Sequence, residues 1–459
     1  MIGKILIANR GEIALRVARA CRELGIRTVA VYSEADADSL HVRAADESVC
    51  IGPPRSRESY LNIPQILSAA QITKAEAIHP GYGFLAENAQ FAEACESSGV
   101  IFIGPGAEAI RGMGDKAVAK SLMREAGVPV VPGSDGIVPT AAEAAALAQE
   151  LGYPVIVKAK DGGGGKGMRI VRGADEMERL FSMAKAEAQA AFGGDALYLE
   201  KFVERPRHIE IQVIGDHQGN VVHLGERDCS IQRRHQKLIE EAPSPALTRS
   251  IREEMGRTAV SGARRIGYSS LGTMEFLFEE ATGRFFFMEM NTRLQVEHPI
   301  TEMVTGLDLV KLQIRVAAGE AIGLRQEDVR MEGHAIECRI NAEDPDHDFR
   351  PSPGEVAQFH LSGGPGIRID SHMVAGAIVS PHYDSLVAKL IAFGADRDEA
   401  LARMERALAE ARIEGVHTTV PFHRQVLAHP DFRAGRYDTS FLDRIQAKAE
   451  EEGATAPSH

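Results

Sequence analysis

The chain has 459 residues, of which 44% are hydrophobic and 25% are charged, and its formal net charge is −13. Such values are typical of a globular protein with a sizeable core and about two to four domains. The acidic balance argues against nucleic acid or an anionic membrane as the main partner, and we find no apolar run of membrane-spanning length. Five scattered cysteines without a C-x-x-C pair, and a strand that begins near residue 4 without a targeting segment, favour the reducing cytoplasm.

The first hundred residues alternate between predicted strands and helices. Strands are expected at 4–8 and 28–32 on either side of a helix at 12–24, and further strands near 76–78 and 100–104. This order is typical of an α/β domain with a parallel sheet.

The segment 81–86 has the sequence Gly-Tyr-Gly-Phe-Leu-Ala and fits the dinucleotide fingerprint G-x-G-x-x-A. An NAD-dependent oxidoreductase is therefore an alternative hypothesis. The next predicted strand ends in Gly104-Pro105 and offers no acid for the ribose hydroxyls, which weighs against it.

A glycine-rich loop at 161–168 follows a helix expected at 140–151 and a strand at 154–158. Consecutive glycines let backbone N–H groups approach a phosphate, and Lys166 can neutralise it. Because Lys166 is followed by Gly rather than Ser or Thr, the loop is not a Walker A motif. Phosphate binding is the favoured interpretation, and a flexible hairpin loop is the alternative.

Antiparallel strands are predicted at 197–202, 208–214 and 221–225, and a dense polar run follows at 226–237. This run is either a solvated strand and loop or a group that holds anions beside a metal. Its histidines and Cys229 lack zinc-ligand spacing. Helices are expected at about 247–266 and 300–318.

A β-hairpin is predicted from strands at 273–278 and 288–298 with a turn at 280–283. The second strand alternates polar odd positions with apolar even ones, and the register places Glu275 opposite Glu289. Directly opposed carboxylates are destabilising unless a cation lies between them, so we expect a Mg²⁺ site here, with Asn291 one step further on the same face. An accidental glutamate pair is the alternative.

The last unit is predicted to begin with a strand at 335–340 and to contain a strand at 386–393 and a helix at 396–411. Residues 447–459 are rich in Glu, then Ala, Pro and Ser, and are expected to be a disordered tail.

Together these motifs closely resemble biotin carboxylases of the ATP-grasp superfamily. The matching segments are 7–14, 79–87, 161–168, 206–210, 226–237, 288–298 and 337–343. The resemblance spans about 1–446. It implies an α/β domain at 1–113, an ATP-grasp domain at 114–333 with a mobile lid at about 131–203, and a C-terminal α+β domain at 334–446.

The resemblance also implies roles for individual residues. The residues that would hold the ATP phosphates and the rest of the nucleotide are Lys116, Lys158, Gly163, Gly164, Gly165, Lys166, Met168 and His235. The adenine would be held by Glu200, Lys201 and Val203, and the ribose would lie near His208. Mg²⁺, or Mn²⁺ as an alternative ion, would be bound by Glu275, Glu289 and Asn291. Bicarbonate would be held by Arg293, Gln295 and the Val296 amide, and Glu297 would deprotonate it. Lys237 would stabilise the anionic intermediate that forms. Arg339 would stabilise the biotin enolate, and Tyr82 would line the biotin pocket.

The implied function is carboxylation of biotin with ATP and bicarbonate through carboxyphosphate. The chain has no Trp and few aromatics, so biotin is expected as a weakly held substrate carried by a partner. No Met-Lys-Met biotinylation segment occurs. We therefore expect the stand-alone subunit of an acetyl-CoA carboxylase, working with a biotin carboxyl carrier protein and carboxyltransferase subunits.

Three alternatives remain open at this stage: a pyruvate, 2-oxoglutarate or other acyl-CoA carboxylase subunit, a different ATP-grasp ligase, and a non-catalytic nucleotide-binding regulator. The chain departs from some relatives at Lys166, where they have Arg, and at Pro365, where they have an aromatic dimer contact. A homodimer is still expected, with Arg16, Arg19, Glu23 and Arg368 available for the interface.

Overall fold

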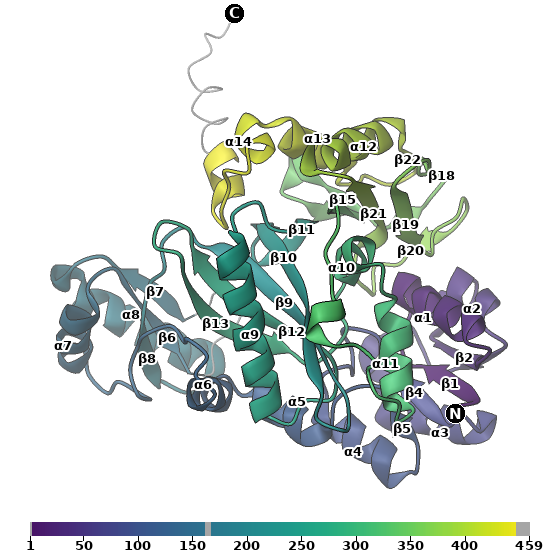
Figure 1. Cartoon of the computed structure of the whole chain (residues 1–459), viewed down its shortest axis with the longest axis horizontal. Helices are drawn as coiled ribbons and strands as arrows, with labels where there is room; N and C mark the ends of the chain where they lie inside the picture. The colour runs from purple at the N-terminus through teal and green to yellow at the C-terminus, as the bar shows by residue number, and fades with distance from the viewer. Residues whose placement is uncertain (1, 161–166, 447–459) are drawn as a thin grey trace, which may run out of the picture.

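The computed structural model describes residues 2–160 and 167–446 (Figure 1). The predictions for Gly163, Gly164, Gly165 and Lys166, and for the tail at 447–459, lie outside the described residues. The fold class predicted from the sequence is confirmed: an N-terminal parallel-sheet unit is followed by mixed helices and strands around a large antiparallel sheet.

The N-terminal unit is a five-stranded parallel sheet with the order β3-β2-β1-β4-β5. Successive residues of its central strand point to opposite layers, because side chains alternate along a strand. Ile5 and Ile7 pack in the cluster that contains α1, whereas Leu6 packs against the opposite layer. The elements are β1 (Lys4–Ile7), α1 (Gly11–Glu23), β2 (Arg27–Tyr32), α2 (Leu40–Ala44), β3 (Glu47–Cys50), α3 (Ile63–Thr73), β4 (Ala77–His79), α4 (Ala89–Ser97), β5 (Ile101–Phe102) and α5 (Ala107–Gly114).

A small unit projects from the body at the left of Figure 1. Its three-stranded sheet, with the order β7-β6-β8, and its two helices enclose an apolar cluster of their own. It lies within the segment predicted to form the lid. The elements are α6 (Lys116–Glu125), which precedes it, then α7 (Ala141–Leu151), β6 (Val155–Ala159), β7 (Met168–Val171), α8 (Met177–Phe192) and β8 (Leu197–Lys201).

The centre of the molecule is an eight-stranded antiparallel sheet with the order β13-β12-β9-β10-β11-β14-β21-β19. It continues without interruption across residue 334, so the predicted second and third units share one sheet. Helix α9 covers one face of β9 and β10. The elements are β9 (Arg207–Gly215), β10 (Val221–Arg233), β11 (Gln236–Ala242), α9 (Arg249–Arg265), β12 (Ser270–Glu279), β13 (Arg284–Asn291), α10 (His298–Thr305), α11 (Leu309–Ala317), β14 (His334–Asn341), β19 (Ile367–Ser371) and β21 (Leu386–Gly394).

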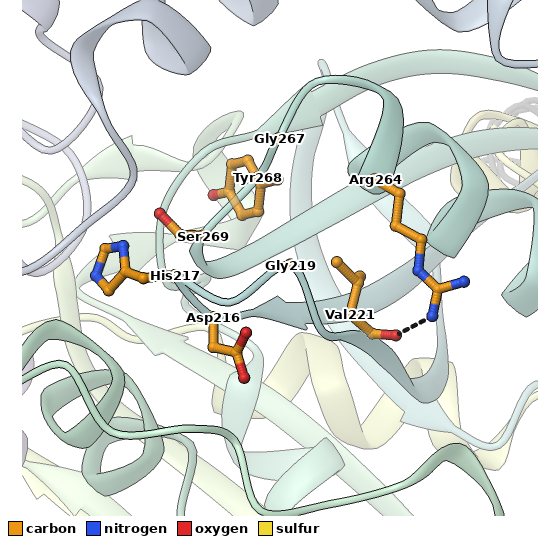
Figure 2. A pocket seen from close by; sticks show the side chains of 8 residues that line it. All are labelled: Asp216, His217, Gly219, Val221, Arg264, Gly267, Tyr268 and Ser269. Atoms are coloured by element: carbon orange, nitrogen blue, oxygen red, sulfur yellow. Dashed lines mark hydrogen bonds between the residues drawn. The ribbon is translucent and has the colours of Figure 1, made fainter.

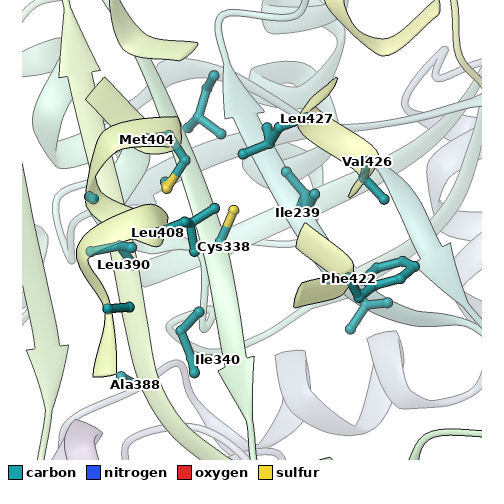
Figure 3. Close-up of a cluster of buried hydrophobic side chains, with 14 of the residues drawn as sticks. Ile239, Cys338, Ile340, Ala388, Leu390, Met404, Leu408, Phe422, Val426 and Leu427 are labelled. Atoms are coloured by element: carbon teal, nitrogen blue, oxygen red, sulfur yellow. The ribbon is translucent and has the colours of Figure 1, made fainter. Parts of the chain in front are cut away.

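The C-terminal helices pack on β14 and β21 through a cluster of buried apolar side chains, which includes Ile340, Leu390, Leu408 and Phe422 (Figure 3). Three short two-stranded sheets lie at its edge. The remaining elements are β15 (Glu343–Asp344), β16 (Arg350–Pro351), β17 (Gly354–Glu355), β18 (Gln358–His360), β20 (Ile378–Val379), α12 (Arg397–Glu410), β22 (Arg412–Glu414), α13 (Val420–Ala428) and α14 (Pro430–Arg433).

Three predicted elements differ in the structure. The strand expected at 288–298 ends at Asn291, because the backbone N–H of Thr292 donates to the Glu87 carboxylate at 2.9 Å instead of continuing the sheet. The helix expected at 300–318 is two helices, separated at Gly306, which has a φ of 70° that glycine adopts without strain. The polar run at 226–237 is exposed only at its turn: β10 extends to residue 233 and its side chains from 226 to 231 are buried, whereas residues 234–236 are exposed.

The five cysteines form no disulfide, and four of them are buried while Cys50 is exposed. Burial raises the pKa of Cys229 and Cys338 well above its usual value, so neither is a reactive thiolate. Among the described residues, no helix has both the length and the apolar character needed to cross a bilayer.

Candidate functional site

The predicted register of the β12–β13 hairpin is confirmed, since Glu275 pairs directly with Glu289. A bulge follows Glu275 and shifts the register for the rest of the hairpin. The Asn291 side chain donates to Glu275 at 2.9 Å. Burial raises the pKa of Glu289, and the neighbouring Glu275 raises it further, so the two carboxylates repel each other as the sequence arithmetic implied.

Lys237, on β11, is the centre of the site. Its Nζ lies 2.5 Å from Glu210, 2.9 Å from Glu275 and 2.6 Å from Glu297. Burial alone would lower the pKa of Lys237, but these three carboxylates raise it well above its usual value. The ammonium is therefore permanently charged and brings β9, β12 and the start of α10 to one point.

Glu297 is fully buried and occupies the N-cap position of α10, where the helix dipole favours a negative charge. Its second oxygen accepts from Arg339 at 2.8 Å. Burial alone would raise the pKa of Glu297, but Lys237, Arg339 and Arg227 lower it well below its usual value. The carboxylate is consequently ionised at neutral pH.

Arg339, on β14, is oriented by a second acid. Its Nε donates to Glu240 at 2.6 Å while its Nη2 reaches Glu297. Burial raises the pKa of Glu240 to about 7, with Arg339 opposing that shift. Glu240 was not predicted from the sequence, because its side chain faces the site only through the pairing of β11 with β14.

Arg227 and Glu210 support this cluster from within the sheet. Both are fully buried, and the Arg227 guanidinium contacts Glu210, Gln212 and the hydroxyls of Thr273 and Thr301. Glu210 lies two positions after His208 on β9 and therefore on the same face. The two-residue spacing from His208 is the sequence feature from which Glu210 could have been predicted as a site residue.

The nucleotide-phosphate candidates gather between α6 and β6. Lys158 donates to Glu200 at 2.6 Å, and Lys120, which was not predicted, contacts the other oxygen of the same carboxylate. Burial lowers the pKa of both lysines to about 8. Lys116 and Glu289 line a neighbouring cavity of about 190 Å³.

The bicarbonate candidates follow β13 as an irregular segment rather than a strand. Gln295 donates to Glu275 at 3.2 Å, and Arg293 donates to Glu87 at 2.8 Å and to Asn291 at 2.9 Å. The segment is thus held by side chains, and Gln295 links it to Glu275, one of the carboxylates around Lys237.

The other predicted residues are placed less centrally. The His208 ring lies 3.0 Å from Glu275, and Tyr82 donates to Glu12 beside the cluster. The Lys201 ammonium is bound to backbone carbonyls of residues 152 and 153, at 2.8 and 3.0 Å, so only its backbone could face a nucleotide. Val203 is buried after β8, Met168 opens β7 opposite Lys158, and His235 is exposed in the β10–β11 turn.

A second hollow lies at the far end of the same sheet, at the β9–β10 turn (Figure 2). Its volume is about 380 Å³, and its lining includes Arg264, whose guanidinium donates to the Val221 carbonyl at 3.3 Å. None of the predicted site residues lines it. The charged cluster, not this hollow, is therefore the candidate active site.

Family models match three consecutive parts of the chain. Residues 1–110 match the biotin carboxylase N-terminal domain, 115–325 the ATP-binding domain of the carbamoyl-phosphate synthase L chain, and 337–444 the biotin carboxylase C-terminal domain. A biotin carboxylase of Nostoc sp. is 59% identical over 96% of this chain and 99% of its own length.

The chain belongs to the biotin carboxylase family. Biotin carboxylase 1 of Bacillus subtilis is 58% identical over 96% of this chain and 98% of its own length. The activity is that of the family: the chain is a ligase that carboxylates biotin with ATP.

The hypothesis of an NAD-dependent oxidoreductase is wrong. The glycines at 81 and 83 belong to a turn, in which the Asn9 side chain donates to the carbonyls of residues 80 and 82, both at 2.7 Å.

Solved biotin carboxylases have the same fold. A complex with β,γ-ATP from Campylobacter jejuni superposes with a TM-score of 0.91 at 50% identity and covers 97% of this chain and 99% of its own. The biotin carboxylase domain dimer of Hydrogenobacter thermophilus 2-oxoglutarate carboxylase, in complex with MgADP, ADP and bicarbonate, has a TM-score of 0.90 at 52% identity and covers 97% and 98%.

Proposed function

We propose that this chain carboxylates biotin on a separate carrier protein through carboxyphosphate, as the first half-reaction of an acetyl-CoA carboxylase. The observation that carries the proposal is the contact of one buried ammonium, that of Lys237, with Glu210, Glu275 and Glu297. It joins the candidate metal ligands to the candidate base within one cluster.

The acidic pair on the hairpin fits a divalent cation. Glu275 and Glu289 are directly opposed, and burial, together with the Glu275 charge, raises the pKa of Glu289; a cation between them would relieve the repulsion. Mg²⁺ favours carboxylate and phosphate oxygens, and when bound here by Glu275, Glu289 and Asn291 it would neutralise the charge of the ATP phosphates. The bicarbonate-bound relative from Hydrogenobacter thermophilus also holds MgADP, which supports this assignment.

Glu297 acts as the base towards bicarbonate in this proposal. Arg293, Gln295 and the Val296 amide hold the anion, and Glu297 removes its proton. The bicarbonate oxygen then attacks the γ-phosphorus of ATP, and ADP leaves. Lys158 and Lys116 offset the charge on the phosphates, and Lys237 stabilises the carboxyphosphate oxygens.

Biotin is carboxylated after carboxyphosphate breaks down to CO₂ and phosphate. The phosphate takes the ureido N–H proton, and the biotin nitrogen attacks CO₂. Arg339 stabilises the enolate; its two acids, Glu240 and Glu297, fix the guanidinium beside the base. Transfer of Arg339 from Glu297 to the enolate would raise the basicity of Glu297, because one of the cations that lower its pKa would move away.

A homodimer is part of the proposal, supported by the dimeric relative of Hydrogenobacter thermophilus. The four predicted interface residues are not equally free. Arg16 is already paired with Glu302 and Asp308, and Arg368 with Glu302. Glu23 is exposed but pairs with Lys311 at 2.5 Å, whereas Arg19 is exposed. Arg19 is therefore the better candidate for contact with a second copy.

The proposal is tested by ADP release from the purified protein with Mg-ATP and bicarbonate, with and without free biotin. We expect biotin-dependent ADP formation that disappears when bicarbonate is removed. ADP release that ignores biotin but responds to another acceptor acid would contradict the substrate assignment.

The final acceptor needs its own experiment, because solved biotin carboxylases of pyruvate and 2-oxoglutarate carboxylases are each 52% identical to this chain. Carboxylated carrier, made by this protein, is offered to carboxyltransferases for acetyl-CoA, pyruvate and 2-oxoglutarate. Transfer to acetyl-CoA alone is expected. Transfer only to a 2-oxo acid would replace the acetyl-CoA assignment and leave the half-reaction intact.

A further inference from the structure

Lys389 is a fully buried lysine that the proposed mechanism does not use. It lies on β21, directly opposite Arg339 of β14. Two cations facing each other on neighbouring strands repel, so each needs partners of its own. Arg339 has Glu240 and Glu297, and Lys389 has a different set.

The Lys389 ammonium contacts the segment that the proposed function assigns to bicarbonate. Its Nζ donates to the Val296 carbonyl at 2.9 Å, while Arg339 contacts the next residue, Glu297, at 2.8 Å. Two adjacent cations on one sheet face therefore hold two consecutive residues. The Val296 carbonyl lies in one planar peptide group with the Glu297 N–H and is separated from the Val296 N–H only by the Cα, so anchoring the carbonyl limits the backbone rotations that orient the Val296 N–H.

The second partner of Lys389 connects to the candidate biotin pocket. Its Nζ lies 2.9 Å from Glu12 Oε1, the same oxygen that accepts from the Tyr82 hydroxyl. Asp370 lies further away, at 3.9 Å. One ammonium thus joins four parts of the chain that are distant in sequence: α1, the 81–86 turn, the segment just before α10, and β21.

We infer that Lys389 is a positioning residue that aligns the bicarbonate-binding Val296 amide with the Tyr82 side of the biotin pocket. The inference rests on the proposed roles of Val296 and Tyr82. Loss of the ammonium would release the Val296 carbonyl and the Glu12 carboxylate together, and would leave the phosphate-binding lysines of α6 and β6 in place.

The charge of Lys389 is retained in the folded protein. Burial opposes the charge, but Glu12, Glu337 and Asp370 outweigh that effect and raise the pKa of Lys389. A buried, permanently charged donor holds its acceptors more firmly than a neutral one, because charge-assisted hydrogen bonds are shorter and stronger.

The test is Lys389→Met, which keeps the length of the side chain and removes the ammonium. We expect the KM for bicarbonate to rise about tenfold or more, as for loss of one charged hydrogen bond, with the KM for ATP changed less than about twofold. Arg397→Met is the matched control, because Arg397 pairs with buried Glu241 on the opposite face of the sheet, at 2.7 and 2.9 Å. The control should lower stability without changing the ratio of the two KM values.

If Lys389 served only to neutralise the neighbouring carboxylates, Lys389→Met would give a different result. If Lys389→Met lowers the unfolding temperature but leaves both KM values unchanged, or raises them equally, the inference is wrong. Where the single variant fails to fold, Lys389→Met with Glu12→Gln removes the uncompensated acid, and the same selective rise in the KM for bicarbonate is expected.

The variant Glu12→Gln alone separates the contact of Lys389 with Val296 from its contact with Glu12. It keeps the contact of Lys389 with Val296 but weakens the acceptor for Tyr82, so the KM for biotin should rise more than that for bicarbonate. A wild-type protein without bicarbonate-dependent turnover would contradict the proposed function itself. A bicarbonate-dependent wild type with an unselective Lys389→Met variant would overturn only the positioning role.

Discussion

The two faces of strands β14 and β21 are built from alternate residues of the same segments, and they are held together by different forces. Cys338, Ile340 and Leu390 point into the apolar cluster under the C-terminal helices (Figure 3). Arg339 and Lys389 point the other way, towards the site. The apolar face gains free energy in proportion to the area removed from water, whereas the charged face depends on each ion finding its partner.

This contrast explains why the site lies where it does. Buried ion pairs add little net stability, since desolvation offsets their attraction, but removing one partner leaves a costly uncompensated charge. The apolar face supplies the stability that allows the opposite face to hold the proposed catalytic charges in fixed positions. Substitutions on either face test this division of roles.

The first prediction concerns the base on the charged face. Glu297→Gln keeps the size of the side chain and removes the proton acceptor, so turnover should fall by about 10²–10⁴-fold. Because the change lies away from Lys158 and Lys116, ADP affinity measured by calorimetry should stay within about twofold of the wild type. Turnover near the wild-type value would refute the assignment of Glu297.

The second prediction concerns a buried charge that contacts no proposed substrate. Arg227→Met leaves Glu210 buried without its main cation and should lower the free energy of unfolding by about 3–5 kcal/mol. Denaturant titration measures the loss. The matched control is Arg249→Met, which breaks an exposed ion pair with Glu253 and should leave the denaturation midpoint unchanged.

The third prediction concerns the apolar face. Leu390→Ala removes a fully buried side chain and should destabilise the fold by about 2–5 kcal/mol through the cavity it leaves. The KM values of the folded fraction should not change, because Leu390 points away from the site. Leu390→Met conserves volume and should cost less than about 1.5 kcal/mol. A selective change in the KM for bicarbonate would show that the faces are not independent.

The smallest effect is the pH dependence of nucleotide binding. Burial lowers the pKa of Lys158 to about 8, so this lysine is charged at pH 7 and loses its proton as the pH rises through 8. The KM for ATP should therefore rise about tenfold between pH 7 and pH 9, since one pKa unit corresponds to a tenfold change. Lys158→Arg stays charged over this range and should reduce the rise; the remainder is expected from Lys120, whose pKa burial also lowers to about 8. If the KM for ATP depends on pH in Lys158→Arg as it does in the wild type, Lys158 is not the cause of the rise.

The local features of the fold could be predicted from the amino-acid sequence. Period-two alternation and a four-residue turn placed Glu275 opposite Glu289, and the structure has that pair. Strand and helix periodicity predicted the parallel N-terminal sheet, and the motifs identified the family. These features depend on neighbouring residues, whose geometry follows directly from strand and helix repeats.

The contacts between residues that are distant in sequence became visible only in the folded chain. The end of β13 at Asn291 depends on Glu87, which lies about two hundred positions earlier in the chain. Glu240 faces Arg339 because β11 pairs with β14, and Lys389 reaches Val296 because β21 pairs with β14 in turn. Such pairings are set by how the sheet is assembled, and no repeat within a single segment encodes them.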